Sequence, residues 1–223
     1  MYKNPYVKIK PPIKKPYTEV FLVRHCHPDY TVEKKVGEYN MPLSRFGREQ
    51  RKHLTKRLLT MKLDSIYASG LRRAQETAAE YVRRSGKKLL IDQRLDEIDW
   101  THWHKIKYFN MSEKTRKNKL KNHRLLDREL DKMQVVARRA LADLFRDNRG
   151  KRIMIFSHGN FIKALITGIL NADIIGFLSL EIFQSSISKF IIDRNGYIKI
   201  SYINDVGHLP LAPSEDAFIT LLD

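Results

Sequence analysis

The sequence predicts a three-layer α/β/α domain, in which a mostly parallel sheet flanked by helices ends in a C-terminal β-hairpin. Short continuous apolar runs predict strands that are buried on both faces of a sheet. These runs alternate with segments of helical periodicity, which favours parallel strands joined by helices. The turn sequence Asp193-Arg194-Asn195-Gly196 between two further runs indicates the hairpin. With 223 residues and 42% hydrophobic content, the chain can bury one full core.

The first half of the chain alternates strands and helices regularly. An apolar run at 19–25 predicts the first strand, and Ser44 can cap a helix that runs to about residue 61. A second strand is expected at 64–69, followed by a turn at Gly70. A helix at 71–84 and a short strand at 89–91 complete this half.

The second half begins with an irregular, basic stretch at 92–124. Helical periodicity is clear at 133–145, with a possible start near 125, and a strand at 152–157 leads into a helix at 160–170. The apolar stretch 164–180 contains Asn171 and Asp173, so we interpret it as a buried helix and a turn rather than a membrane span. Strands at 187–192 and 197–202 form the hairpin.

The composition limits the domain organisation and the binding partners that we expect. Residues 1–18 are expected to form a basic, proline-rich arm, and residues 19–223 a single domain with a basic insertion around 101–128. The net charge of +17 attracts anions in general. The basic segments lack interleaved aromatic residues, and no helix-turn-helix or zinc pattern is present, so no nucleic-acid partner is expected.

The single cysteine and the missing apolar leader predict a cytoplasmic protein.

Two histidines follow directly on apolar runs, which suggests an anion site. Arg24-His25 ends the first strand and Ser157-His158-Gly159 ends the fourth. Ligands of open α/β sheets bind beyond the carboxyl ends of the strands. Arg73 adds a permanent cation in the first turn of a helix, where free N–H groups also favour anions. This set of residues suits a phosphoryl group.

The same residues offer a nucleophile and an acid. A histidine with one neutral nitrogen can attack phosphorus and carry the phosphoryl group. Glu97 lies between Asp96 and Asp99, and we expect these like charges to raise its pKa toward the range that an acid catalyst needs.

At these positions the sequence resembles the histidine phosphatase superfamily, which includes the cofactor-dependent phosphoglycerate mutases. The resemblance spans nearly all of 19–210 and rests on blocks in the family's order. They are Leu-Val-Arg-His at 22–25, Met-Pro-Leu-Ser-Arg-Phe-Gly at 41–47, the block Tyr67 to Ala78 with its Arg-Ala pair, Leu-Asp-Glu-Ile-Asp-Trp at 95–100, Ser-His-Gly at 157–159, and Asn-Asp-Val-Gly-His-Leu at 204–209.

The resemblance implies a role for each matching residue. His25 would become phosphohistidine, Arg24, Arg73 and His158 would complete the phosphate pocket, and Glu97 would be the proton donor. Arg73 takes the arginine position instead of Arg72 because it directly precedes Ala74. The expected substrate-binding residues are Arg24, Arg73, His158, Gly159, Cys26, His27 and His102.

The implied activity is a metal-independent phosphomonoesterase that uses no cofactor and acts on a small anionic phosphate ester. Mutases of the family carry longer insertions after the glutamate and near the C-terminus, so hydrolysis is the preferred prediction. Phosphoglycerate mutase activity is one alternative. The other is a polyanion-binding module that keeps the fold and has lost catalysis.

Several positions depart from the family pattern. Cys26 stands where the family has glycine, and His27-Pro28 replaces its Glu-Thr/Ser. Both glycines and the second glutamate of the motif after Glu97 are missing, which leaves a basic rim that includes His102 and His104. His27, His102 and His104 could hold a metal, but no carboxylate or cysteine spacing supports one. We expect them to line the substrate mouth.

Overall fold

The structure, a computed structural model, describes residues 15–98 and 123–210, and in the second part it describes side chains from residue 127 onward. Its strands are β1 (Thr18–Arg24), β2 (Ser65–Ala68), β3 (Leu89–Ile91), β4 (Arg152–Ser157), β5 (Ile187–Ile192) and β6 (Ile198–Asp205). The longer helices are α2 (Arg45–Leu58), α3 (Arg72–Ser85), α6 (His123–Asp147) and α7 (Gly159–Leu170), and α8 (Ile174–Ser179) is short.

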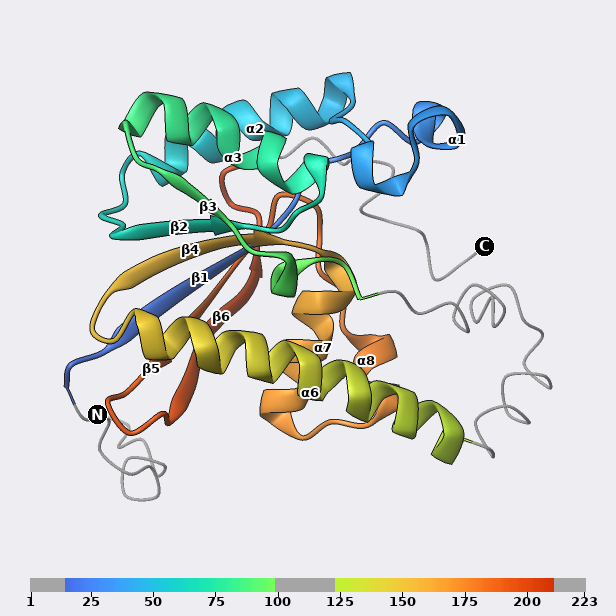
Figure 1. Cartoon of the computed structure of the whole chain (residues 1–223), viewed down its shortest axis with the longest axis vertical. Coiled ribbons are helices and arrows are strands. Elements are labelled where there is room, and N and C mark those ends of the chain that lie inside the picture. Colours follow the sequence, from blue (N-terminus) through green and yellow to red (C-terminus); the bar gives the residue numbers. More distant parts are fainter. Residues whose placement is uncertain (1–14, 99–122, 211–223) are drawn as a thin grey trace, which may run out of the picture.

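The strands form one sheet in the order β3-β2-β4-β1-β5-β6. Strands β3, β2, β4 and β1 are parallel, whereas β5 and β6 add an antiparallel pair beside β1. Helices α2 and α3 cover one face of the sheet, and α6, α7 and α8 lie on the other (Figure 1). The predicted three-layer α/β/α fold with a C-terminal hairpin is therefore confirmed.

Alternate side chains of β1 point to the two faces of the sheet, as the pleat of a strand requires. Val20 and Leu22 pack into the core cluster under α6 and α7, whereas Phe21 and Val23 pack into the cluster under α2 and α3. The strand is buried on both sides because helices cover both faces. This explains why its sequence is a continuous apolar run.

Helix α2 begins where Ser44 predicts it. The Ser44 hydroxyl accepts a hydrogen bond from the Gly47 N–H and so caps the first turn. Gly47 lets this turn approach the loop after β1 closely, because a Cβ at this position would lie 2.0 Å from the carbonyl oxygen of His27. The start of α2 is thereby fixed against the segment that follows His25.

The remaining boundaries differ from the prediction mainly in loops. The loop between β1 and α2 contains helical turns at Tyr30–Val32 (η2), Glu33–Val36 (α1) and Glu38–Asn40 (η3), where only a loop was expected. Such single turns follow local caps, as at Asp29, whose carboxylate accepts from the Thr31 N–H. The stretch 92–124, expected to be irregular, contains a 3₁₀ turn at Gln93–Leu95 (η4).

Helix α6 includes 123–128, the end of the expected basic insertion, and Thr18, the last residue of the expected arm, already belongs to β1. The rest of the arm and of the insertion lies largely outside the described residues. The stretch 164–180 forms the end of α7, a turn with left-handed Asn171, and α8. Within the described ranges, no helix combines the length and apolarity that a bilayer crossing requires.

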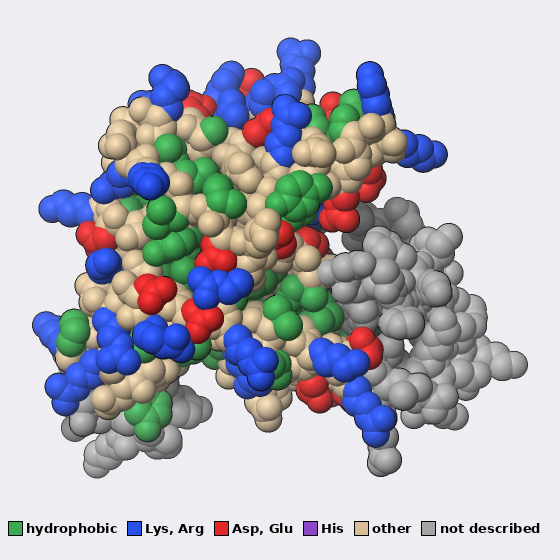
Figure 2. All heavy atoms as spheres, viewed as in Figure 1, with side chains coloured by type: hydrophobic (Ala, Val, Ile, Leu, Met, Phe, Trp, Pro, Cys, Tyr) green, Lys and Arg blue, Asp and Glu red, His purple; other side chains and the backbone are tan. Residues whose placement is uncertain are grey.

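Basic side chains are distributed rather than concentrated on the face shown in Figure 2. Lys and Arg residues lie over its edges and are interspersed with Asp and Glu. A continuous basic track, which a nucleic-acid strand would follow, is not visible on this face.

Because the backbone at Gly47 lies close to His27, we predict that a larger residue at this position destabilises the fold. Gly47→Ala places a methyl group against backbone atoms of His27, which cannot move without displacing the loop after His25. We expect a loss of about 1–3 kcal/mol in the free energy of unfolding, measured by urea denaturation. Arg45→Ala, an exposed change in the same helical turn, is the control. Equal stability of the two variants would contradict this account.

Candidate active site

Parallel pairing of β1 with β4 brings His25 and His158 together. Arg24 lies opposite Ser157 in the register, and the His25 N–H donates to the Ser157 carbonyl at 2.9 Å. Both histidines therefore leave the same edge of the sheet, with ring centroids 5.1 Å apart. Their side chains are almost completely buried.

The hydrogen bonds of His25 determine which ring nitrogen is free. Nδ1 lies 2.8 Å from the Cys26 carbonyl oxygen. A carbonyl can only accept, so Nδ1 carries the proton and a neutral ring keeps its lone pair on Nε2. Burial, together with the charges of Arg24 and Arg73, holds the pKa of His25 well below its usual value. The ring is therefore neutral, with an unprotonated Nε2 at the sheet edge.

The ring of His158 is kept neutral as well, by its contact with Ser69 and by burial. Its Nε2 lies 2.6 Å from Ser69 Oγ, which also accepts from the Leu71 N–H at 3.2 Å. The Ser69 hydroxyl hydrogen is thus available for Nε2, and the imidazole proton then resides on Nδ1. Burial and the neighbouring positive groups hold the pKa of His158 well below normal. His158 Nδ1 is buried and has no hydrogen-bond partner among the described residues.

Arg73 projects from the first turn of α3 into the same cluster. Its Nε donates to His25 Nε2 at 3.3 Å, and its two terminal nitrogens contact Glu38. The neighbouring Arg72 points away and pairs with Glu76 at 2.6 Å. The structure therefore places Arg73, not Arg72, beside the candidate nucleophile.

Arg24 lies across the start of α7. A Cβ at Gly159 would be 3.3 Å from both Cζ and Nε of Arg24, so the absence of a side chain there lets the guanidinium approach the helix. One terminal nitrogen donates to the Ile182 carbonyl. The Nε is buried without a partner among the described residues. An anion at the helix start would meet both this donor and the helix dipole.

Glu97 reaches the same helix start from the end of η4. Its Oε1 accepts from the backbone N–H groups of Asn160 at 3.1 Å and Phe161 at 3.2 Å. Burial raises the pKa of Glu97 to about 7, against the opposing effect of Arg24. The predicted direction is therefore right, but the largest cause is burial and not the like charge of Asp96, while Asp99 lies outside the described residues. Desolvation raises the pKa, and the neighbouring Asp96 turns away to accept from the Gly70 N–H.

Three expected substrate-binding residues remain, and the structure describes two of them, Cys26 and His27. The Cys26 side chain is fully buried in the α2–α3 core, and burial raises its pKa to about 12, so the thiol is not a reactive group. His27 is half-buried, with Nδ1 2.9 Å from Ser44 Oγ and its ring against Tyr30 and Phe46. His102 lies outside the described residues. Among residues that the structure describes, no group of three His, Cys, Asp or Glu side chains is arranged to hold a metal.

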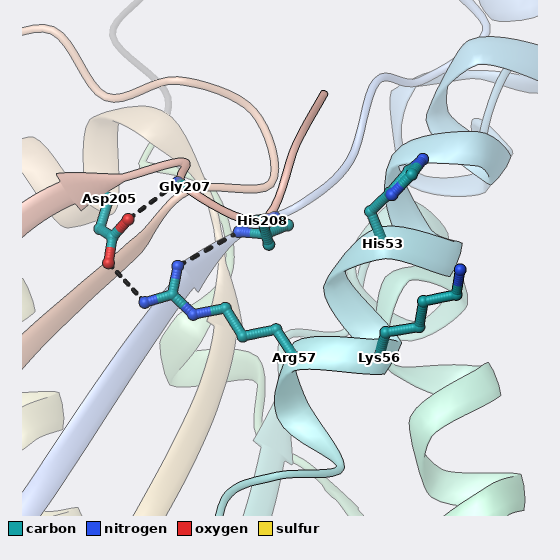
Figure 3. Close-up of a pocket in the computed structure, with 6 residues that line it drawn as sticks. All are labelled: His53, Lys56, Arg57, Asp205, Gly207 and His208. Carbon is teal, nitrogen blue, oxygen red and sulfur yellow. Dashed lines mark hydrogen bonds and ion pairs between the residues drawn. The ribbon is translucent and has the colours of Figure 1, made fainter. Parts of the chain in front are cut away.

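Sequence reasoning identified no contacts between the C-terminal block and the His25 loop, and the structure shows a group of them. Ser185, in a left-handed conformation with φ 67°, donates its N–H to the carbonyls of Arg24 and His25. Its Oγ lies 2.9 Å from Nε2 of His208, whose Nδ1 faces Arg57. Arg57 also pairs with Asp205 (Figure 3). We call Ser185, His208, Arg57 and Asp205 the clamp. The Asn-Asp-Val-Gly-His-Leu block contains two of these residues, but spacing along the chain does not reveal their contacts.

Figure 3 shows the hollow beside this clamp. It has a volume of about 580 Å³ and is lined by His53, Lys56, Arg57, Asp205, Gly207 and His208. None of the five residues at the sheet edge lines it. The hollow is therefore separate from the cluster of His25, His158, Arg24, Arg73 and Glu97, and the clamp contacts the His25 loop through Ser185.

The raised pKa of Glu97 makes stability depend on pH. Its folded-state pKa of about 7 exceeds the ordinary value of 4.5, so the stabilising effect of the protonated form is complete below about pH 4.5 and is lost as the pH rises to about 7. Glu97→Gln keeps an acceptor for α7 and does not ionise. We expect its stability relative to wild type to increase from pH 5 to pH 8 in urea denaturation. The exposed Glu33→Gln is the control, and a pH-independent difference for Glu97→Gln would refute the assignment.

Comparisons with known proteins agree with this geometry. Residues 20–205 match the sequence profile of the histidine phosphatase superfamily (branch 1). A probable phosphoglycerate mutase from Enterobacter sp. (strain 638) is 27% identical over 89% of this chain and 97% of its own length. Phosphoglycerate mutase-like protein 4 of Arabidopsis thaliana is 30% identical over 67% of this chain and 70% of its own. The structure of phosphoserine phosphatase from Entamoeba histolytica with 3-phosphoglyceric acid superposes with a TM-score of 0.69 at 22% identity, over 86% of this chain and 100% of that one. With its histidine pair, arginines and glutamate at one sheet edge, this chain belongs to the histidine phosphatase superfamily.

Proposed function

We propose that the protein is a metal-independent phosphomonoesterase that hydrolyses a small anionic phosphate ester through a phosphohistidine intermediate. The observation that carries the proposal is the state of His25. Its Nε2 is unprotonated and lies beside Arg73, in a cluster that also contains a carboxylic acid with a pKa of about 7. Residues 19–223 would form the single catalytic domain.

In the first step, His25 Nε2 attacks the phosphorus of the bound ester. The bond between phosphorus and the ester oxygen breaks, and Glu97 donates its proton to that oxygen, so that an alcohol leaves. The positive charges of Arg24 and Arg73 compensate the negative charge on the transferred group. His158 Nδ1 offers a further donor, because it is buried and has no partner among the described residues.

In the second step, the Glu97 carboxylate accepts a proton from a water molecule that attacks phosphohistidine. The bond between phosphorus and Nε2 breaks, inorganic phosphate leaves, and both His25 and Glu97 regain their starting states. A pKa of about 7 suits both directions of proton transfer near neutral pH. Neither step requires a metal or an organic cofactor.

The other predicted contacts take supporting roles in this proposal. Gly159 admits the Arg24 guanidinium to the start of α7, and the Cys26 carbonyl holds the His25 tautomer. His27 and His102 remain our prediction for the mouth of the site. The substrate is a small molecule, and we place the protein in the cytoplasm because its one cysteine is a free thiol.

Phosphoglycerate mutase activity is the alternative that the names of two relatives favour. A mutase must return the phosphoryl group to a phosphoglycerate instead of to water. The two reactions share His25, Glu97 and the first chemical step. They differ in the acceptor of the second step, so a product assay separates them.

The first test is hydrolysis of p-nitrophenyl phosphate near pH 6 in EDTA. We expect activity that survives chelation and is abolished by His25→Ala. Arg73→Gln should lose about a hundredfold or more in kcat/KM, whereas Arg72→Gln, its exposed neighbour, should keep wild-type activity. Wild-type inactivity on this substrate would move the mutase and the polyanion-binding module ahead of the phosphatase, and conversion of 3-phosphoglycerate primed with 2,3-bisphosphoglycerate would then identify a mutase.

A second test isolates Glu97 as the acid. Because its pKa is about 7, kcat should fall as the pH rises above about 7 and the acid form disappears. Glu97→Gln should lose about 10²-fold or more in kcat/KM, which reports the first step alone, on an alkyl phosphate, whose alkoxide leaves poorly without a proton. The loss on p-nitrophenyl phosphate should be much smaller, because nitrophenolate departs unprotonated. Equal losses on both substrates would exclude Glu97 as the proton donor.

A further inference from the structure

The guanidinium of Arg73 is occupied by an anion that belongs to the protein itself. One terminal nitrogen donates to the Glu38 carbonyl at 2.9 Å, and the other donates to the Glu38 carboxylate at 3.0 Å. Its Nε faces His25 Nε2. All three nitrogens of the guanidinium are therefore engaged, and each terminal one is bonded to Glu38.

Glu38 approaches from outside the cluster. It begins the η3 turn in the loop between β1 and α2, and it follows Gly37, whose φ of 76° marks a change in chain direction. The Glu38 side chain is 60% exposed, whereas that of Arg73 is only 5% exposed. When the Glu38 carboxylate moves away from Arg73, water can thus solvate it. Arg73 has no comparable access to solvent.

A phosphate group beside His25 Nε2 needs the same guanidinium. The terminal nitrogens of arginine bind phosphate oxygens bidentately, and they cannot hold two anions in that geometry at once. A substrate phosphate must therefore displace the Glu38 carboxylate or share Arg73 with a like charge. Either way, the affinity of the site for phosphate is reduced by the presence of Glu38.

We propose that Glu38 is an internal competitor of the substrate phosphate and so determines how tightly the site holds phosphate esters. The inference rests on the proposed function, because it concerns the same pocket. A purely positioning role, in which Glu38 orients Arg73 for the substrate, predicts the opposite sign. Removing a competitor tightens phosphate binding, whereas removing a support weakens it.

The test compares Glu38→Gln with Glu33→Gln. Glutamine keeps the size of the side chain and removes the charge. Glu33 is exposed in α1, in the same loop, and no side-chain contact joins it to Arg73, so its variant controls for the loss of charge alone. Inorganic phosphate binding is measured by isothermal titration calorimetry, and kcat and KM are measured with p-nitrophenyl phosphate.

We expect Glu38→Gln to bind inorganic phosphate about two- to tenfold more tightly, the range expected when one half-exposed ion pair to arginine is removed. KM should fall by a similar factor while kcat stays within about twofold. Glu33→Gln should match wild type. Weaker or unchanged phosphate binding in Glu38→Gln, or equal tightening in Glu33→Gln, would overturn the proposal.

The calorimetric arm separates this inference from the proposed function, because it needs no turnover. Tighter phosphate binding in an enzyme that hydrolyses no ester would refute only the phosphatase. Hydrolysis by wild type with no gain in phosphate binding by Glu38→Gln would refute only the role of Glu38.

Discussion

The pairing of β1 with β4 is the contact on which the rest of the site depends. Parallel strands that lie side by side end at the same edge of the sheet, and here a histidine follows directly on each one. The backbone bond from the His25 N–H to the Ser157 carbonyl fixes the relative height of the two strand ends. A different register would move His25 and His158 apart and carry Arg24 away from the start of α7.

Burial then determines the chemistry of the groups assembled there. Desolvation disfavours charge, so it keeps both histidines neutral and raises the pKa of Glu97 to about 7. Within the cluster of five, Arg24 and Arg73 keep their charge, because arginines stay protonated in any protein environment. The site thus presents permanent positive charge, a neutral nucleophilic nitrogen and a transferable proton. This combination suits an incoming phosphate ester, whose negative charge pairs with the arginines.

Loops hold this arrangement from several sides. Ser185 and His208 clamp the backbone after β1 from the hairpin, and Gly47 admits the start of α2 to the same loop. On the open side, Glu38 contacts Arg73 directly. The rigid contacts position the nucleophile, whereas the exposed one competes for the arginine that the substrate needs. The His25 loop is held in place, whereas the Glu38 carboxylate can leave Arg73. This arrangement is compatible with substrate binding followed by release of product.

The sequence alone predicts the fold class, because apolar runs and helical periodicity depend only on which residues must be buried. It also brought Arg24, His25 and His158 to strand ends, because a motif that ends a run must lie at an edge of the sheet. The folded chain was needed to establish the His25 tautomer, the cause of the raised Glu97 pKa, the burial of Cys26 and the contact between Glu38 and Arg73. Each of these depends on atoms from segments far apart in the chain, and on how much water their packing excludes. Spacing along one strand or helix does not contain that information.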